Sequence, residues 1–237
     1  MTAYEVDAAR GSAPTRGDAF SGVVLALGAA ALFVGTLFYA RLTPQLGLPA
    51  LPAERAQALA DALSLGAQRL ALAGGFAFLG DCLLLVACIA LASRGRRLSS
   101  DLESVGWALM AVNVVIAMVF DSMTAALFWP LAHGSDREPF LAFKAWFDFL
   151  FAAGNVPFGV GFMMVLLADA RGGSPLMPKQ LSLFGFAVGS AAAVSGLGYA
   201  TDVLHMPLVI GLTVTFGCVI LAALGVQIVR RARVVER

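Results

Sequence analysis

Residues 105–129 read VGWALMAVNVVIAMVFDSMTAALFW, an almost unbroken apolar run that contains Asn113, Asp121 and Thr124. The run is long enough to cross a bilayer, which takes about 20 apolar residues in a helix. At about 100° per residue, the three polar side chains fall on one side of such a helix. Because an ionisable group at membrane depth is costly, that side is expected to face protein or water and not lipid.

The composition of the whole chain places it among membrane proteins. Of its 237 residues, 59% are hydrophobic and 13% are charged, and the mean hydropathy is +0.85. A soluble domain is less apolar and needs more polar surface than this chain has. The formal net charge of +1 gives no indication of nucleic acid as a partner. We predict an all-α, polytopic membrane protein whose main partner is the lipid bilayer.

Six apolar stretches are predicted to span the bilayer, so that residues 20–230 form one six-helix transmembrane domain. They cover about residues 20–40, 69–92, 105–129, 143–168, 181–200 and 208–229. Residues 1–19 are predicted to be a mobile tail, and residues 231–237 a short basic tail. The short connections after the second and fifth spans predict that sequential helices are antiparallel neighbours.

The basic residues predict the orientation of the chain. With six alternating spans, eleven of the sixteen Lys and Arg residues fall on one side of the membrane and five on the other. The side richer in basic residues is the cytoplasmic one. Both termini are therefore predicted to be cytoplasmic. The eleven residues are Arg10, Arg16, Arg94, Arg96, Arg97, Arg171, Lys179, Arg230, Arg231, Arg233 and Arg237.

Residues 41–68, between the first two spans, are too polar to cross the membrane and open with three prolines. After Pro52, polar residues recur every three or four positions and face away from a stripe of Ala and Leu. This pattern predicts an amphipathic helix on the outer membrane surface. A lid over an outward-facing cavity is the alternative.

Polar side chains also occur within the neighbouring spans. Counted at about 1.5 Å per residue from the outer helix ends, they descend into the membrane and are expected to line one polar track. No Lys or Arg lies at the middle depth of any span, so the inner acids cannot pair with a basic side chain. The predicted site comprises Asp81, Asn113, Asp121, Asp148 and Asn155.

Two interpretations of these acids are open at the level of sequence. Each carboxyl group must be protonated, hydrogen-bonded, hydrated or bound to a cation. If the acids form a binding site, they predict a transporter-like protein that binds or moves a small molecule, a proton or a cation. As neutral acids that cross-link helices, they predict a non-catalytic accessory or structural subunit that packs against a membrane protein partner or another copy.

Enzyme chemistry leaves little trace in this sequence. The only histidines, His133 and His205, fall at predicted outer helix ends, and the cysteines Cys82, Cys88 and Cys218 lie in apolar segments without zinc or disulfide spacing. No serine-nucleophile, zinc-protease or phosphate-loop motif is present. We predict no cofactor and no metal, and the sequence favours a protein that is not an enzyme. An intramembrane enzyme acting on lipid is the third possibility.

Glycines in the fifth span are predicted to serve helix packing. Gly185 and Gly189 form a small-x-x-x-small pair, and Ser182 and Gly196 lie near the same face. Such pairs let helix backbones approach closely, so we expect a contact between helices here and not a ligand. Pro157 cannot donate to the helix ladder, and a kink in the fourth span is expected.

Three segments resemble those of a known family. NVPFGVG at 155–161, LMPK at 176–179 and GLGYATD at 196–202 are similar to a bacterial six-helix integral membrane protein family that is catalogued only as a domain of unknown function. The resemblance extends more loosely to the segment after the first span, and so covers nearly all of the chain after residue 20. It implies six spans in the bacterial cytoplasmic (inner) membrane. It implies no activity, ligand or catalytic residue.

Overall fold

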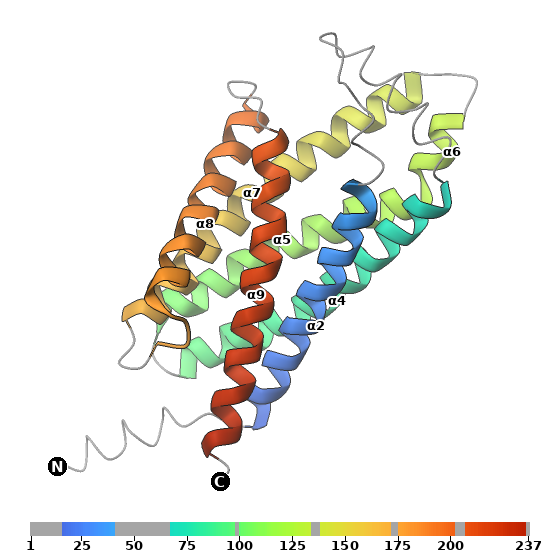
Figure 1. Cartoon of the computed structure of the whole chain (residues 1–237). Coiled ribbons are helices and arrows are strands. Elements are labelled where there is room, and N and C mark those ends of the chain that lie inside the picture. The colour runs from blue at the N-terminus through green and yellow to red at the C-terminus, as the bar shows by residue number, and fades with distance from the viewer. Residues whose placement is uncertain are drawn as a thin grey trace, which may run out of the picture.

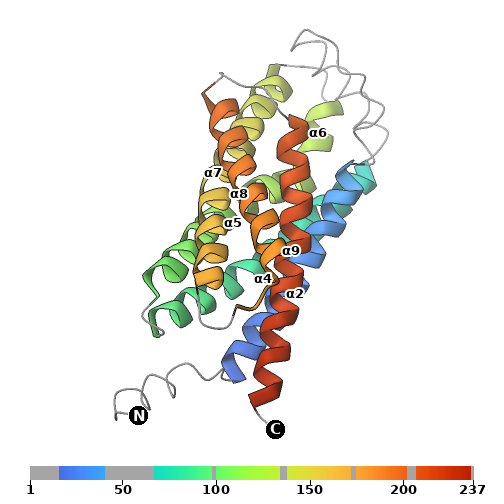
Figure 2. The ribbon, with the colours of Figure 1, turned by 60° about the vertical axis from the view of Figure 1, so that its left-hand side comes forward.

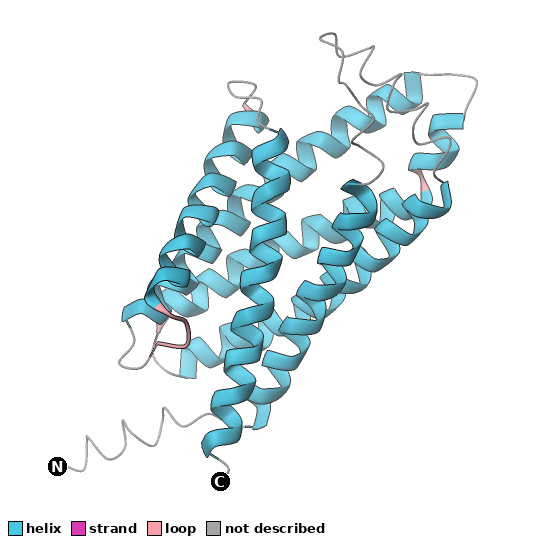
Figure 3. Ribbon diagram, viewed as in Figure 1, coloured by secondary structure: helices cyan, strands magenta, loops and turns pink. Residues whose placement is uncertain are grey.

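The computed structural model describes residues 16–40, 67–97, 100–133, 138–171, 175–201 and 207–235. Figure 3 shows these residues as helices, with a few short loop segments and no strand. Apart from the short α6, each helix is long and apolar enough to cross a membrane. The helices, labelled in Figure 1, are α2 (Arg16–Ala40), α4 (Ala67–Arg97), α5 (Asp101–Ala126), α6 (Phe128–His133), α7 (Glu138–Arg171), α8 (Lys179–Ala200) and α9 (Pro207–Val235).

The described part of the chain contains six helices that are long and apolar enough to cross a membrane, at the places where six spans were predicted. The third ends earlier than predicted, because α5 stops at Ala126 and α6 follows as a separate short helix. If α5 continued, Pro130 would meet the Ala126 carbonyl without an N–H to donate to it. At the ends of the chain, α2 already begins at Arg16 and α9 continues to Val235. The predicted amphipathic helix falls on residues 41–66, which lie outside the described part of the chain, and the orientation of the termini stays a prediction.

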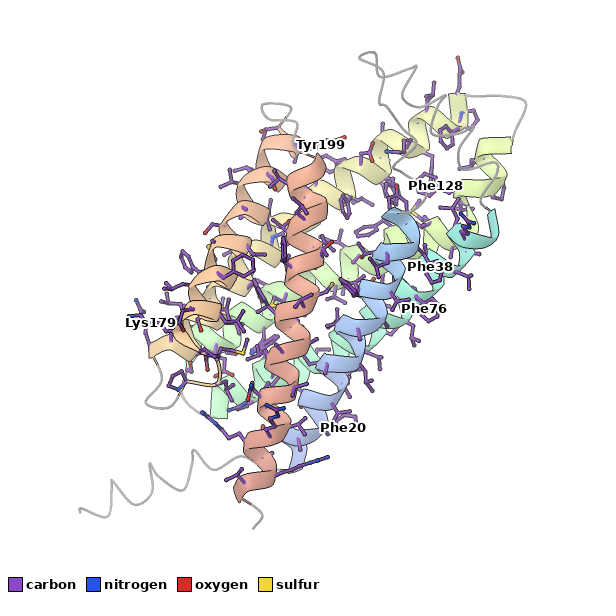
Figure 4. The ribbon with its side chains drawn as sticks, viewed as in Figure 1. Phe20, Phe38, Phe76, Phe128, Lys179 and Tyr199 are labelled. Carbon is purple, nitrogen blue, oxygen red and sulfur yellow. The ribbon has the colours of Figure 1, made fainter. Side chains whose placement is uncertain are left out.

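The spanning helices form a ring in the order of the chain. Each packs against the next, from α2 through α4, α5, α7 and α8 to α9, and α9 packs back against α2. Figure 2 shows red α9 beside blue α2. We call the end of the bundle where α2 begins and α9 ends the terminal end. Figure 4 shows Phe20 and Lys179 toward the terminal end, and Tyr199 and Phe128 toward the opposite end.

Glycine pairs let neighbouring helices approach backbone to backbone. Between α2 and α4, a Cβ added at Gly28 would lie 2.9 Å from the Gly80 carbonyl oxygen, and one added at Gly80 would lie 2.8 Å from the Gly28 carbonyl oxygen. Between α5 and α7, a Cβ at Gly161 would lie 2.5 Å from the Gly106 carbonyl oxygen. Helices in a bilayer gain little from burying apolar surface against each other, so close packing of this kind holds them together.

The packing role predicted for the glycines of α8 is confirmed. A Cβ added at Gly189 would lie 2.8 Å from the carbonyl oxygen of Gly159 on α7. Gly185 faces the Leu166 side chain on α7 and, at 3.5 Å from its Cβ position, the Ile220 side chain on α9. Gly189 therefore sets the α7–α8 contact, and Gly185 makes room for apolar side chains of two other helices.

Large apolar side chains fill the middle of the ring. One buried cluster draws residues from all six spanning helices. Phe158 of α7 reaches across to α9, where a Cβ added at Gly217 would lie 2.6 Å from the tip of its ring. Phe158 therefore occupies the centre at this level. The fully buried members of the cluster include Leu25, Leu91, Trp107, Phe162, Leu166, Ile220 and Leu224.

A second, aromatic cluster lies near the opposite end, between α5, α6 and α7. The ring centroid of Phe128 lies 4.7 Å from that of Phe147, edge to face, and the Phe120 and Phe147 centroids are 5.6 Å apart. On the outside of the bundle, large apolar side chains such as Leu79 and Val219 are exposed. Exposed apolar surface of this extent fits contact with the lipid bilayer.

Candidate functional site

Asp81 of α4 and Asp121 of α5 form a buried pair of carboxyl groups. Asp81 is 1% exposed and Asp121 is 8% exposed, and the two side chains are close enough to interact directly. Two ionised carboxylates only accept hydrogen bonds, so the contact becomes a hydrogen bond when one of them carries a proton. Without that proton, neither oxygen of Asp81 nor Oδ2 of Asp121 has a hydrogen-bond partner among the described residues.

The helix contact between α4 and α5 explains why these acids meet. A Cβ added at Gly74 would lie 2.5 Å from the backbone N of Ala125 and 2.7 Å from the carbonyl oxygen of Asp121. The backbone of α5 is therefore pressed against α4 at this point. Asp81 follows Gly74 by seven residues, which is two helical turns, and so shares the face of α4 that Gly74 presents to α5.

Two groups from other helices lie near the pair. Asp121 interacts electrostatically with the phenol of Tyr39 on α2. Both acids interact electrostatically with the thiol of Cys218 on α9. Cys82, next to Asp81 on α4, is also within reach of that acid. The titratable groups that interact with the carboxyl pair are therefore weakly acidic. No basic side chain of the described residues is hydrogen-bonded to the oxygen atoms left without a partner.

Thr124 confirms the expected inward side of the third span. Its side chain is 3% exposed and its hydroxyl donates to the Phe120 carbonyl oxygen at 2.9 Å. Asn113 is only half-buried. Its Oδ1 lies 3.1 Å from the position that a Cβ would take at Gly154 of α7. The polar side chains of α5 thus face two different helices. Asp121 faces α4, and Asn113 faces α7.

The other predicted site residues have local partners of their own. Asn155 is 4% exposed, and its Nδ2 donates to the Phe151 carbonyl oxygen one turn earlier, at 2.7 Å. Asp148 forms an ion pair with Lys144, also one turn earlier, and its side chain is 30% exposed. The structure therefore brings together Asp81 and Asp121, while Asn113 lies at the α5–α7 contact and Asp148 beside Lys144 on α7. Asn155 lies at the α7–α8 contact, where its Cβ is 3.0 Å from the position that a Cβ would take at Gly196.

Tyr39 and Cys218 were not predicted from the sequence. The phenol of Tyr39 interacts electrostatically with both Asp148 and Asp121. A single tyrosine at a helix end and a cysteine in an apolar helix give no signal in the sequence. Helix packing alone brings them to the acids.

Within the described residues, no group of three or more His, Cys, Asp or Glu side chains is placed to hold a metal ion. The side chains of His133 and His205 are outside the part of the chain that is described. Comparison of the chain with protein-family models, with curated proteins and with solved structures found no match. The resemblance to a six-helix bacterial family stays a prediction.

Proposed function

We propose that this chain is a multi-pass membrane protein that binds a proton between Asp81 and Asp121. The proposal rests on the surroundings of Asp81. Its side chain is 1% exposed, and neither carboxyl oxygen has a hydrogen-bond partner among the described residues. A second carboxyl group, that of Asp121, lies beside it. Buried polar atoms are almost always satisfied. One proton shared by the two acids turns two facing acceptors into a charge-assisted O–H···O hydrogen bond, which is among the strongest in proteins.

A proton suits the space around the pair better than the other ligands that the sequence suggested. Phe158 reaches Gly217 on α9, and the next residue, Cys218, is buried and interacts electrostatically with both acids, so apolar side chains fill the bundle next to the pair. A metal cation such as Ca²⁺ or Mg²⁺ takes about six or more oxygen ligands, and an organic ligand needs a cavity. A proton needs neither. It also removes one of two negative charges that would otherwise lie together in an apolar environment.

Uptake and release of this proton would act on helix packing. Without the proton, Asp81 and Asp121 would place two like charges at an interface where α5 touches Gly74 of α4. Movement of α4 away from α5 would let water or a counter-ion reach these charges. A ligand that binds one of two arrangements more tightly shifts the protein toward it. Protonation would therefore favour the closed α4–α5 contact, as a transporter-like, proton-driven protein requires.

The filled centre also fits a second candidate, a non-catalytic accessory or structural subunit. In that case, the shared proton would be permanent and would serve only to cross-link α4 and α5. The broad exposed apolar surface would then contact a partner protein as well as lipid. The two candidates differ in whether the proton exchanges during function.

Proton movement by the purified full chain in liposomes separates the candidates. A pH-sensitive dye inside the vesicles would report acidification after an external acid jump. We expect vesicles that contain the wild type to acidify faster than empty vesicles, and vesicles that contain Asp121→Asn to acidify no faster than empty ones. The unfolding free energy of Asp121→Asn should change by less than about 1 kcal/mol, because the amide keeps a donor and an acceptor. Asp121→Leu should cost about 1–3 kcal/mol, because it leaves Asp81 unpaired. Equal proton movement in wild type and Asp121→Asn, with both substitutions equally destabilising, would support the accessory subunit.

A further inference from the structure

A hollow of about 290 Å³ lies at the terminal end of α9, away from the carboxyl pair. We propose that it binds the phosphate headgroup of an anionic phospholipid. Its lining combines two arginines and an amide with apolar carbon. The lining residues are Leu176, Gln227, Arg230, Arg231 and Val234.

The two arginines of this lining differ in their contacts and exposure. The guanidinium of Arg231 donates through one nitrogen to the Pro175 carbonyl oxygen at 2.9 Å, which fixes its direction. The guanidinium of Arg231 is therefore held at the wall of the hollow, where it keeps its positive charge. Arg230 is exposed, and the described residues provide it with no ion pair. Arginine binds phosphate oxygens with two parallel N–H donors, which makes it the usual residue for planar recognition of phosphate.

The part of the hollow that Leu176 lines is held in place by Asp169. Its carboxylate accepts the backbone N–H of Leu176 at 2.7 Å and that of Met177 at 3.1 Å. Met177 is 2% exposed, so this end of the α7–α8 turn is anchored in the core. The turn presents Leu176 to the hollow and the Pro175 carbonyl to Arg231. Asp169 is thus occupied by backbone donors, and its charge is already partly compensated.

The position of the hollow favours a lipid over a soluble anion. The apolar run of α9 ends at Val229 and is followed directly by Arg230 and Arg231, so the hollow lies at the edge of the membrane-spanning region. Val234 is 74% exposed and offers apolar surface next to the arginines. At about 290 Å³, the hollow is near the lower limit of small-molecule pockets, which hold roughly 300–1,000 Å³, and so accommodates a headgroup and not a whole lipid.

The attraction must come from the arginine side chains. A helix C-terminus carries a partial negative charge, so the backbone of α9 disfavours an anion here. Basic pockets between helices at a membrane surface are where anionic headgroups bind. Removing one of the two guanidinium groups should therefore weaken lipid binding sharply and leave the fold intact, because Arg230 is exposed.

Lipid binding to the purified full chain in detergent tests the proposal. Phosphatidylglycerol and phosphatidylcholine would be titrated separately, with bound lipid counted by native mass spectrometry. Arg230→Gln is compared with Arg233→Gln, which removes an exposed arginine of the same helix turn that does not line the hollow. We expect wild type and Arg233→Gln to bind phosphatidylglycerol alike. Arg230→Gln should bind it about tenfold more weakly or worse, as the loss of a hydrogen bond to a charged group predicts.

Two results would overturn the proposal. Equal weakening by Arg230→Gln and Arg233→Gln would mean that lipid responds to the overall charge of the helix end and not to the hollow. Inorganic phosphate that displaces phosphatidylglycerol at matched concentration, or phosphatidylcholine that binds equally well, would show that the anionic lipid is not the ligand. The unfolding temperature of each variant without lipid should equal that of the wild type, which confirms that the comparison is between folded proteins.

Discussion

Gly22 of α2 and Gly225 of α9 lie backbone to backbone. A Cβ added at Gly22 would be 2.7 Å from the Gly225 carbonyl oxygen, and a Cβ added at Gly225 would be 2.6 Å from the Gly22 carbonyl oxygen. This contact joins the first and last spanning helices and so closes the ring of helices. No side chain fits between backbones at this separation, so closure depends on two residues that have none.

A methyl group at this contact is predicted to destabilise the bundle. Gly225→Ala should lower the unfolding free energy by about 1–3 kcal/mol, because the new Cβ pushes α2 and α9 apart. Gly211→Ala is the matched control on the same helix, since nothing lies within 4 Å of a Cβ there. The control should be neutral or gain up to about 1 kcal/mol, because Ala favours a helix over Gly. Denaturant titration in detergent measures both, and equal stability of the two variants would contradict the closed ring.

Asp169 is predicted to hold the turn between α7 and α8. Asp169→Ala removes the acceptor for the N–H groups of Leu176 and Met177, and should cost about 1–3 kcal/mol, the penalty of leaving buried donors unpaired. Asp169→Asn keeps one acceptor oxygen and should lose less. Hydrogen exchange of the Met177 amide provides the measurement. Unchanged exchange in the alanine variant would show that the carboxylate does not hold this turn.

The Lys144–Asp148 ion pair is predicted to contribute little. The pair is one turn apart on α7, and the two side chains are 18% and 30% exposed. Partly exposed pairs at this spacing contribute about 0.3–0.5 kcal/mol. Asp148→Asn should therefore change the unfolding free energy by less than about 0.5 kcal/mol and should leave proton movement in liposomes at the wild-type level. A loss as large as that of Asp121→Leu would place Asp148 in the central site.

The orientation of the chain is predicted from its basic residues alone. A reporter enzyme fused after Arg237 should be active in the cytoplasm, and one inserted at Ser135 should report the external side, because eleven of sixteen basic residues fall on the side of the termini. Protease protection in inverted membrane vesicles provides an independent check. Reporters on the same side of the membrane would contradict six spans.

The individual helices of the fold could be predicted from the sequence, because each has its own apolar segment. Apolar length and helical periodicity depend on one segment at a time, and they predicted the six spans. The ring could not be predicted, because Gly22 and Gly225 are far apart in sequence. No local sequence pattern indicates that these two glycines pack against each other. The end of α5 at Ala126 was missed because the apolar run continues past it, although Pro130 was the signal.

The candidate site was predicted in part for a similar reason. The cost of a charge at membrane depth identified Asp81 and Asp121 as inward-facing residues, which the structure bears out. Their direct contact depends on Gly74 pressing α4 against α5, which no single-segment pattern contains. Asn155 was expected in the same track, but a helix offers a buried amide its own carbonyl one turn back. Sequence periodicity does not distinguish that local bond from a contact across the bundle.

The shared proton itself can be observed by infrared spectroscopy of the full chain in lipid nanodiscs at neutral pH. A protonated carboxyl group has a C=O stretching band that an ionised one lacks, and this band shifts in heavy water. We predict such a band in the wild type and in Asp148→Asn, and its loss when Asp81 and Asp121 are both changed to Asn. A wild-type spectrum that matches that of the double variant, with no carboxyl band lost, would contradict a proton held between Asp81 and Asp121.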